Sequence, residues 1–105
     1  MATTSKVLAR TAASLTTTTV LYTVPASTTT IVTNIAVTNT SSTAGTFTLA
    51  MGPSGSQVAL HTTTSIPSNS TVYIDLKQVL VATNTITGGA SATSINFHIS
   101  GVEIA

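Results

Sequence analysis

The feature that most constrains this chain is a strict alternation of apolar and polar residues in short stretches. The alternation is clearest at 46–51, 71–77 and 94–100. Successive side chains of a β-strand point to opposite faces of a sheet, so each stretch is predicted to be a strand with one buried face. The apolar residues of these strands form the predicted core, namely Phe47, Leu49, Val72, Ile74, Leu76, Ile95, Phe97 and Ile99. Phe97 is expected at its centre, because it is one of two phenylalanines and lies within the most regular alternation.

Residues that favour turns divide the chain at short intervals. They cluster at 24–26, 39–42, 52–55, 66–69 and 87–89. Strands are predicted between them, near 6–12, 19–24, 28–38, 45–51, 57–65, 70–77 and 94–104, with a weaker strand near 79–86. No stretch has a sustained helical period, and the best helical candidate, 76–82, is short. Seven or eight strands at this spacing predict an all-β fold, an antiparallel β-sandwich that is jelly-roll-like, in a single domain spanning residues 1–105.

The alternation changes phase at Gly101. The spacing of the preceding apolar residues places residue 101 inward, but the next apolar residues are Val102 and Ile104. One inserted residue restores the phase, and Gly is common at such insertions, so the sequence predicts a β-bulge at Gly101. The alternative is a strand that passes from one sheet to the other at this point.

Composition excludes several kinds of function. Charged residues make up 5% of the chain, and they are Lys6, Arg10, Asp75, Lys77 and Glu103. Three cations cannot neutralise many phosphates, so no nucleic-acid partner is expected. The longest apolar run, 79–82, is too short to cross a bilayer, so no membrane partner is expected. The chain has no cysteine, which excludes thiolate metal sites and thiol nucleophiles.

The same composition leaves the sheet edges without their usual protection. β-Proteins commonly block exposed edges with Lys, Pro or inward charges, whereas 38 of the 105 residues here are Ser or Thr. A net charge of +1 also gives copies of the chain little mutual repulsion. We therefore expect a lasting assembly in which neighbouring subunits cover the edges, and a homotrimer is the expected form. The alternative is a monomer whose Thr-rich faces and bulges protect it.

The candidates for a chemical site are few and scattered. His98 and Asp75 lie on outward faces of predicted strands and could meet, but nothing indicates a catalytic triad. Together with His61 and Glu103 they are potential metal ligands, but the four lack the spacing of a metal site. We therefore expect no catalytic residue, no metal and no cofactor.

Four stretches carry a family resemblance that covers the chain from residue 6 to residue 104. They are Leu-Tyr-Thr-Val-Pro-Ala at 21–26, a β-rich segment with Val-x-Asn at 30–39, the alternating segment 46–51, and a final segment that ends in Gly-x-Glu-Ile, 95–104. In these stretches the sequence resembles a group of small virion proteins of tailed bacteriophages. The resemblance implies a non-enzymatic structural component of the particle. The high Thr content and the Thr/Ser-rich turn after Asn39 depart from that group.

Among such components, we expect a capsid decoration (cement) protein on the outer surface of the phage head. It would bridge subunits of the major capsid protein and so stabilise the shell. Residues 1–13 are expected to form an extended N-terminal arm or an edge strand, in which Lys6 and Arg10 are candidate contacts with the capsid. One alternative is a tail, baseplate or fibre-associated component. Another is a carbohydrate-binding module for host adsorption, built on Tyr22 or Tyr73.

Overall fold

The computed structural model describes residues 3–105, and all of its regular structure is β-strand. The strands are β1 (Thr3–Ala12), β2 (Val20–Thr23), β3 (Thr29–Asn39), β4 (Gly45–Pro53), β5 (Val58–Ile66), β6 (Ser70–Leu80), β7 (Asn84–Ala90) and β8 (Ile95–Ile104). Within residues 3–105 there is no helix long and apolar enough to cross a membrane. The short stretch 76–82, the best helical candidate in the sequence, is not helical either, since β6 continues to Leu80.

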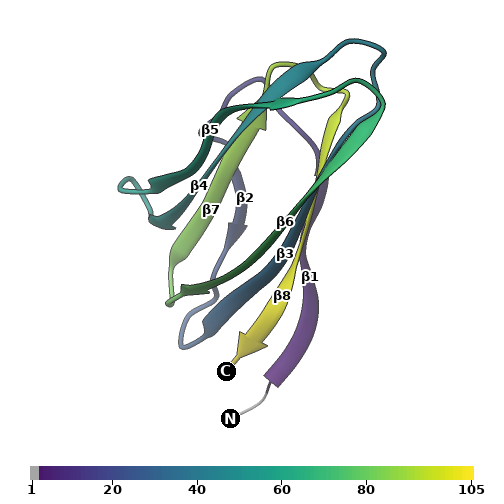
Figure 1. Ribbon diagram of the computed structural model, residues 1–105. Helices are drawn as coiled ribbons and strands as arrows, with labels where there is room; N and C mark the ends of the chain where they lie inside the picture. The colour runs from purple at the N-terminus through teal and green to yellow at the C-terminus, as the bar shows by residue number, and fades with distance from the viewer. Residues whose placement is uncertain (1–2) are drawn as a thin grey trace.

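The strands pair as one long antiparallel ribbon, β1 with β8, β2 with β7, β3 with β6, and β4 with β5. The ribbon wraps on itself, so that β3 also pairs with β8 and β4 also pairs with β7. Two four-stranded sheets result, which we call sheet A (β1-β8-β3-β6) and sheet B (β2-β7-β4-β5). Figure 1 shows the two sheets facing each other. The predicted antiparallel β-sandwich is confirmed, with the strand order of a jelly roll.

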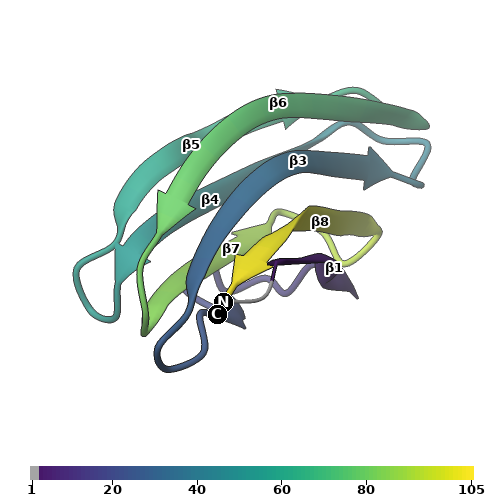
Figure 2. The ribbon, with the colours of Figure 1, turned by 90° about the horizontal axis from the view of Figure 1, so that it is seen from below.

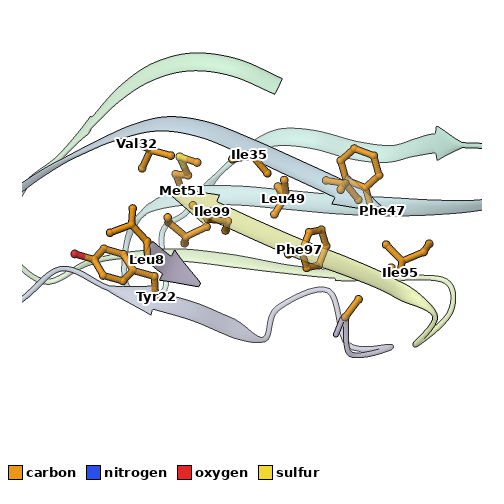
Figure 3. Close-up of a cluster of buried hydrophobic side chains, with 14 of the residues drawn as sticks. Leu8, Tyr22, Val32, Ile35, Phe47, Leu49, Met51, Ile95, Phe97 and Ile99 are labelled. Carbon is orange, nitrogen blue, oxygen red and sulfur yellow. The ribbon is translucent and has the colours of Figure 1, made fainter. Parts of the chain in front are cut away.

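The core lies between the two sheets and centres on a pair of aromatic rings. Phe97 of β8 is fully buried and meets Phe47 of β4 edge to face, with 6.3 Å between ring centroids. Leu49, Ile95 and Ile99 are buried around this pair (Figure 3). The remaining residues of the predicted core are half-buried and pack against it, namely Val72, Ile74 and Leu76. They lie on β6, whose outer edge has no neighbouring strand, so one flank of each side chain stays open.

Strand β7 occupies a position where the sequence predicts a turn. Gly88 and Gly89 lie inside this buried strand, between β2 and β4. A Cβ at Gly88 would lie 2.7 Å from both Leu49 Cδ2 and the Thr48 carbonyl oxygen. The two glycines are therefore here because neighbouring atoms approach the backbone closely, not because the chain reverses. The turn predicted at 87–89 is wrong. The weak eighth strand predicted near 79–86 is shifted along the chain, since the turn lies at 81–83 and the strand is β7.

Strand β8 keeps its alternation through Gly101, so the predicted bulge at that residue is also wrong. The extra residues lie in the two neighbouring strands, Leu8 in β1 and Thr33 in β3. Leu8 fills the space that a side chain at residue 101 would need, since a Cβ there would lie 2.9 Å from Leu8 Cδ1. Because the phase is kept, Glu103 lies on the inner side of the sheet, two positions beyond Gly101.

The N-terminal segment was expected to be an extended arm or an edge strand, and in the structure it is an edge strand. Residues Thr3–Ala12 form β1, which pairs with β8 along its length and closes one edge of sheet A. Residues 1 and 2 of the expected arm lie outside the described residues. Figures 1 and 2 show β1 alongside β8, and Thr3 at the start of β1 pairs with Ile104 at the end of β8.

Candidate functional site

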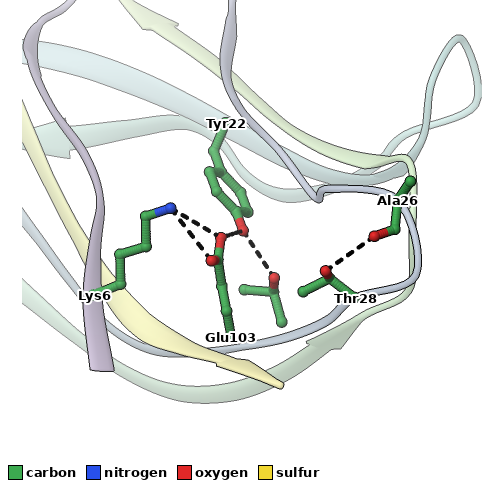
Figure 4. A network of polar contacts seen from close by, with 6 residues as sticks. Lys6, Tyr22, Ala26, Thr28 and Glu103 are labelled. Carbon is green, nitrogen blue, oxygen red and sulfur yellow. Dashed lines mark hydrogen bonds and ion pairs between the residues drawn. The ribbon is translucent and has the colours of Figure 1, made fainter. Parts of the chain in front are cut away.

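Four side chains from four strands meet between the two sheets near the chain ends. Glu103 of β8 accepts a hydrogen bond from the Tyr22 hydroxyl of β2, with 2.5 Å between the oxygens. Lys6 Nζ of β1 lies 3.3 Å from both carboxylate oxygens of Glu103. The Tyr22 oxygen also lies 2.8 Å from Thr30 Oγ1 of β3. Because the Tyr22 hydrogen is donated to Glu103, Thr30 donates to Tyr22. We call these four residues the polar clasp (Figure 4).

The surroundings of the clasp fix the charge of its two acidic groups. Burial and the hydrogen bond to the Glu103 carboxylate raise the pKa of Tyr22 from 10.0 to about 12, although the Thr30 hydroxyl acts in the opposite direction. The hydrogen bond from Tyr22 and the ammonium group of Lys6 lower the pKa of Glu103, against the effect of burial. Tyr22 is therefore neutral and Glu103 ionised across the physiological range.

This arrangement suits a structural role better than acid–base chemistry. A general acid or base works best when its pKa lies near the working pH, and both clasp groups are shifted away from neutrality. Tyr22 belongs to sheet B, whereas the other three clasp residues belong to sheet A. The clasp therefore joins the two sheets with charge-assisted hydrogen bonds at the end of the sandwich where β1 begins and β8 ends.

The two pKa shifts predict how stability depends on pH. The pKa of Glu103 is lower in the folded than in the unfolded chain, so its contribution is complete above the ordinary pKa of 4.5 and is lost as the pH falls through the folded value. The pKa of Tyr22 is higher in the folded chain, so its contribution is complete below pH 10.0 and is lost between 10.0 and about 12. We expect the urea midpoint to fall at both ends of the pH range.

Two substitutions test this assignment. Tyr22→Phe should flatten the alkaline fall and cost about 1–2 kcal/mol at pH 7, because Glu103 loses a hydrogen-bond donor. Glu103→Gln should flatten the acid fall. The matched control is Tyr73→Phe, which removes a hydroxyl from an exposed side chain. An alkaline fall that survives Tyr22→Phe, measured by circular dichroism in urea, would contradict the role of the clasp.

The two candidate capsid contacts do not form one basic patch. Lys6 lies opposite Gly101, on the inner side of β1, and its ammonium group is held by Glu103. Arg10 lies opposite His98, on the outer side, and is exposed. Of the two, Arg10 is the one whose charge faces outward, away from the clasp.

The other polar candidates lie far apart in the fold. The His61 ring packs on Phe47 in β4, with 5.5 Å between centroids. His98 lies on the outer face of sheet A, and Asp75 lies on β6 near the Asn34 amide. Throughout residues 3–105, no three His, Asp or Glu side chains gather as metal ligands would.

The two tyrosines that could build a carbohydrate platform also differ in exposure. Tyr22 is buried with its hydroxyl in the clasp, whereas Tyr73 is 73% exposed on β6. A platform would therefore rest on Tyr73 alone.

The outer face of sheet A presents apolar residues that were not among the predicted site residues. Ile31 lies opposite Val102 on one side and Val79 on the other, and Val79 is 62% exposed. Val81, directly after β6, is 57% exposed. Large exposed apolar side chains next to a free sheet edge are typical of surfaces that meet another protein. The alternation through β6 is the signal that could have identified Val79 and Val81.

Comparisons with known proteins concern the fold. No protein-family model matches the chain, and no curated protein matches its sequence. Among solved structures, the chain is similar to a chain in the crystal structure of the T13 particle of infectious bursal disease virus (IBDV), with a TM-score of 0.58 and 9% identity. It is also similar to a chain of the Gx strain of that virus, with a TM-score of 0.51 and 12% identity.

Both likenesses cover 97% of this chain, which spans 30% and 32% of the two viral chains. At these identities, the likeness shows that this chain shares its jelly-roll fold with one part of a larger protein of a viral particle.

Proposed function

We propose that this protein is a non-enzymatic structural component of a virus particle. The observation that carries the proposal is the jelly-roll pairing of all eight strands, together with a likeness over 97% of the chain to a part of a protein in the IBDV particle. The polar clasp supports it, since it joins the sheets and the pKa values of Tyr22 and Glu103 are both shifted away from neutral pH. The exposed apolar residues of β6 support it as well, since a particle component must bind neighbouring subunits.

The finer proposal is a decoration protein of a bacteriophage head. In this role several copies, expected as a homotrimer, bind the outer surface of the shell and bridge subunits of the major capsid protein. Each copy would make several weak contacts, and their combination holds it far more tightly than one contact could. Arg10 is the candidate contact with an acidic capsid patch, because it lies on the outer side of β1, whereas the Lys6 ammonium group is held by Glu103. A tail, baseplate or fibre component is the alternative position within the particle.

Particles purified from the source organism test the proposal. We expect mass spectrometry to find the chain in particles after washing in high salt, and gel densitometry to give its copy number. Hundreds of copies per particle indicate a head component, whereas a few tens or fewer indicate a tail or baseplate component. Absence of the chain from washed particles would contradict the structural role itself.

A further inference from the structure

We infer that two copies of this chain pair edge to edge through β6, antiparallel and centred on Leu76, so that their A sheets become one continuous sheet. The partner is a second copy of the same chain, related by a two-fold axis. This inference goes beyond the proposed function, because it depends only on the free edge of β6 and holds for any position in a particle. A two-fold contact of this kind would link trimers to one another, not build them.

Among the four edge strands, β6 is the one best suited to pairing. Strand β2 has four residues. Strand β5 changes register twice against β4, and its Thr63 has a φ of 46°. Strand β1 is interrupted at Leu8. Strand β6 has 11 residues without a proline, and its side chains alternate between exposed and half-buried from Ser70 to Lys77. Strand β6 also changes register against β3, between Asp75 and Gln78, but its side chains keep their alternation up to Lys77. Short edges and edges with broken alternation resist pairing, whereas a long alternating edge invites it.

The residues of β6 are complementary to themselves in one register. When the pair is centred on Leu76, Asp75 of each copy lies opposite Lys77 of the other copy, so the two-fold axis gives two such pairs. Tyr73 lies opposite Val79 of the second copy, and both are largely exposed in the single chain. Opposite charges and aromatic–β-branched pairs are the favourable cross-strand combinations.

The neighbouring registers lack this match. A pair centred on residue 75 sets Asp75 opposite Asp75 of the second copy. A pair centred on residue 77 sets Lys77 opposite Lys77 of the second copy. Like charges directly opposite each other are unfavourable. A centre at residue 74 or 78 sets the charged residues opposite neutral ones. The sequence of β6 therefore favours the centre at Leu76 over the registers on either side.

The surface around Leu76 has room for the contact. An open hollow of about 460 Å³ lies next to Leu76 and is lined by Thr33, Asp75, Leu76 and Lys77. Over the part of the chain that the structure describes, the ion pair is Lys6–Glu103, so Asp75 and Lys77 have no ion partner there. The Asp75 carboxylate instead has the Asn34 amide at 3.4 Å. The hollow can receive the Lys77 side chain of the second copy, next to a carboxylate that is not in an ion pair.

The bend of sheet A is compatible with this pairing. From Asp75 to Gln78 β6 advances by three residues, while β3 advances by two, from Asn34 to Val32. The longer outer strand curves around the shorter inner one, as Figure 2 shows for β3 and β6. The free edge of β6 is therefore convex, so two copies related by an axis at Leu76 approach each other most closely around that residue.

A single cysteine tests the register, because the chain has none of its own. In Leu76→Cys the two new cysteines lie directly opposite each other, with Cα atoms about 4.5–5.5 Å apart, which suits a disulfide. We expect mild oxidation to give a covalent dimer in this variant. Thr71→Cys is the matched control and should give none, since residue 71 faces residue 81 of the second copy.

Charge reversal within the Leu76→Cys chain tests the ion pairs. Asp75→Lys or Lys77→Asp sets like charges opposite each other twice, and each should weaken self-association about 100-fold. Mixing the two variants, one of them enlarged by a tag, should restore pairing and give the mixed disulfide dimer. Arg10→Asp, the same change of charge on β1, should leave dimer formation unchanged.

If Leu76→Cys does not fold, cysteines at the exposed residues Tyr73 and Val79 provide a second test of the register. Tyr73→Cys and Val79→Cys should each fail to cross-link alone and should cross-link when mixed. No mixed dimer in either experiment, or equal yields for all charge variants, would overturn the inference. Neither result would bear on the particle proposal, which is tested on purified particles.

Discussion

Phe97→Ala should leave the isolated protein largely unfolded at room temperature. The Phe97 side chain is fully buried between the sheets and meets Phe47 at the centre of the core. Removing such a ring costs about 3–5 kcal/mol, because the lost burial and the remaining cavity both destabilise. Many domains have a total stability of roughly 5–15 kcal/mol, so little or none would remain.

Urea unfolding followed by far-ultraviolet circular dichroism, at fixed protein concentration, measures this loss. His98→Ala is the matched control, because His98 follows Phe97 in β8 and points to the outer face. It should change the free energy of unfolding by less than about 0.5 kcal/mol. A loss below about 1 kcal/mol for Phe97→Ala would mean that the two rings do not form the centre of the core.

Gly101→Ala should destabilise the protein by about 3 kcal/mol, a large effect for one added methyl group. Its Cβ would lie 2.4 Å from the Ile31 carbonyl oxygen and 2.9 Å from Leu8 Cδ1. The Leu8 side chain could move, but the carbonyl belongs to the backbone of β3, which pairs with β8 at this point. Relief would therefore require the two strands to separate locally.

Two further variants separate these contacts in the same urea experiment. Ser100→Ala, next to Gly101 but on the outer face, should have little effect. Adding Leu8→Ala to Gly101→Ala should not restore stability, because the contact with the Ile31 carbonyl oxygen remains. Recovery in the double variant would show that Leu8 alone makes Gly101 necessary.

The sequence was informative where structure is determined locally. The alternation around Phe47, Val72 and Phe97 predicted strands, and these are β4, β6 and β8. The sequence did not predict the structure of segments whose conformation depends on packing against other strands. Gly88 and Gly89 suggest a turn when considered alone, but they lie in a strand because atoms of other strands and loops approach the backbone there. The burial of Ile86 in the same strand depends on that packing too.

The polar clasp illustrates the same limit for the site. Lys6 was considered as a capsid contact, Glu103 as a metal ligand and Tyr22 as a sugar platform, each in a separate hypothesis. Tyr22 and Glu103 are 81 residues apart, and no local period relates them. Their meeting depends on β8 keeping its phase through Gly101, while the extra residues lie in the neighbouring strands, at Leu8 and Thr33. Such a dependence emerges only when the strand order is known.

The place of β8 within sheet A has a consequence for how the chain folds. It lies between β1 and β3, yet in sequence it follows every other strand. Until β8 is available, β1 has no partner in its sheet and one side of β3 stays unpaired. Contacts between distant parts of a chain form slowly, and unpaired strand edges are prone to aggregate until their partner strand pairs with them. We therefore expect the chain to fold slowly. A nascent chain that lacks residues 95–104 should remain partly open, and its unpaired strand edges should make it prone to aggregate.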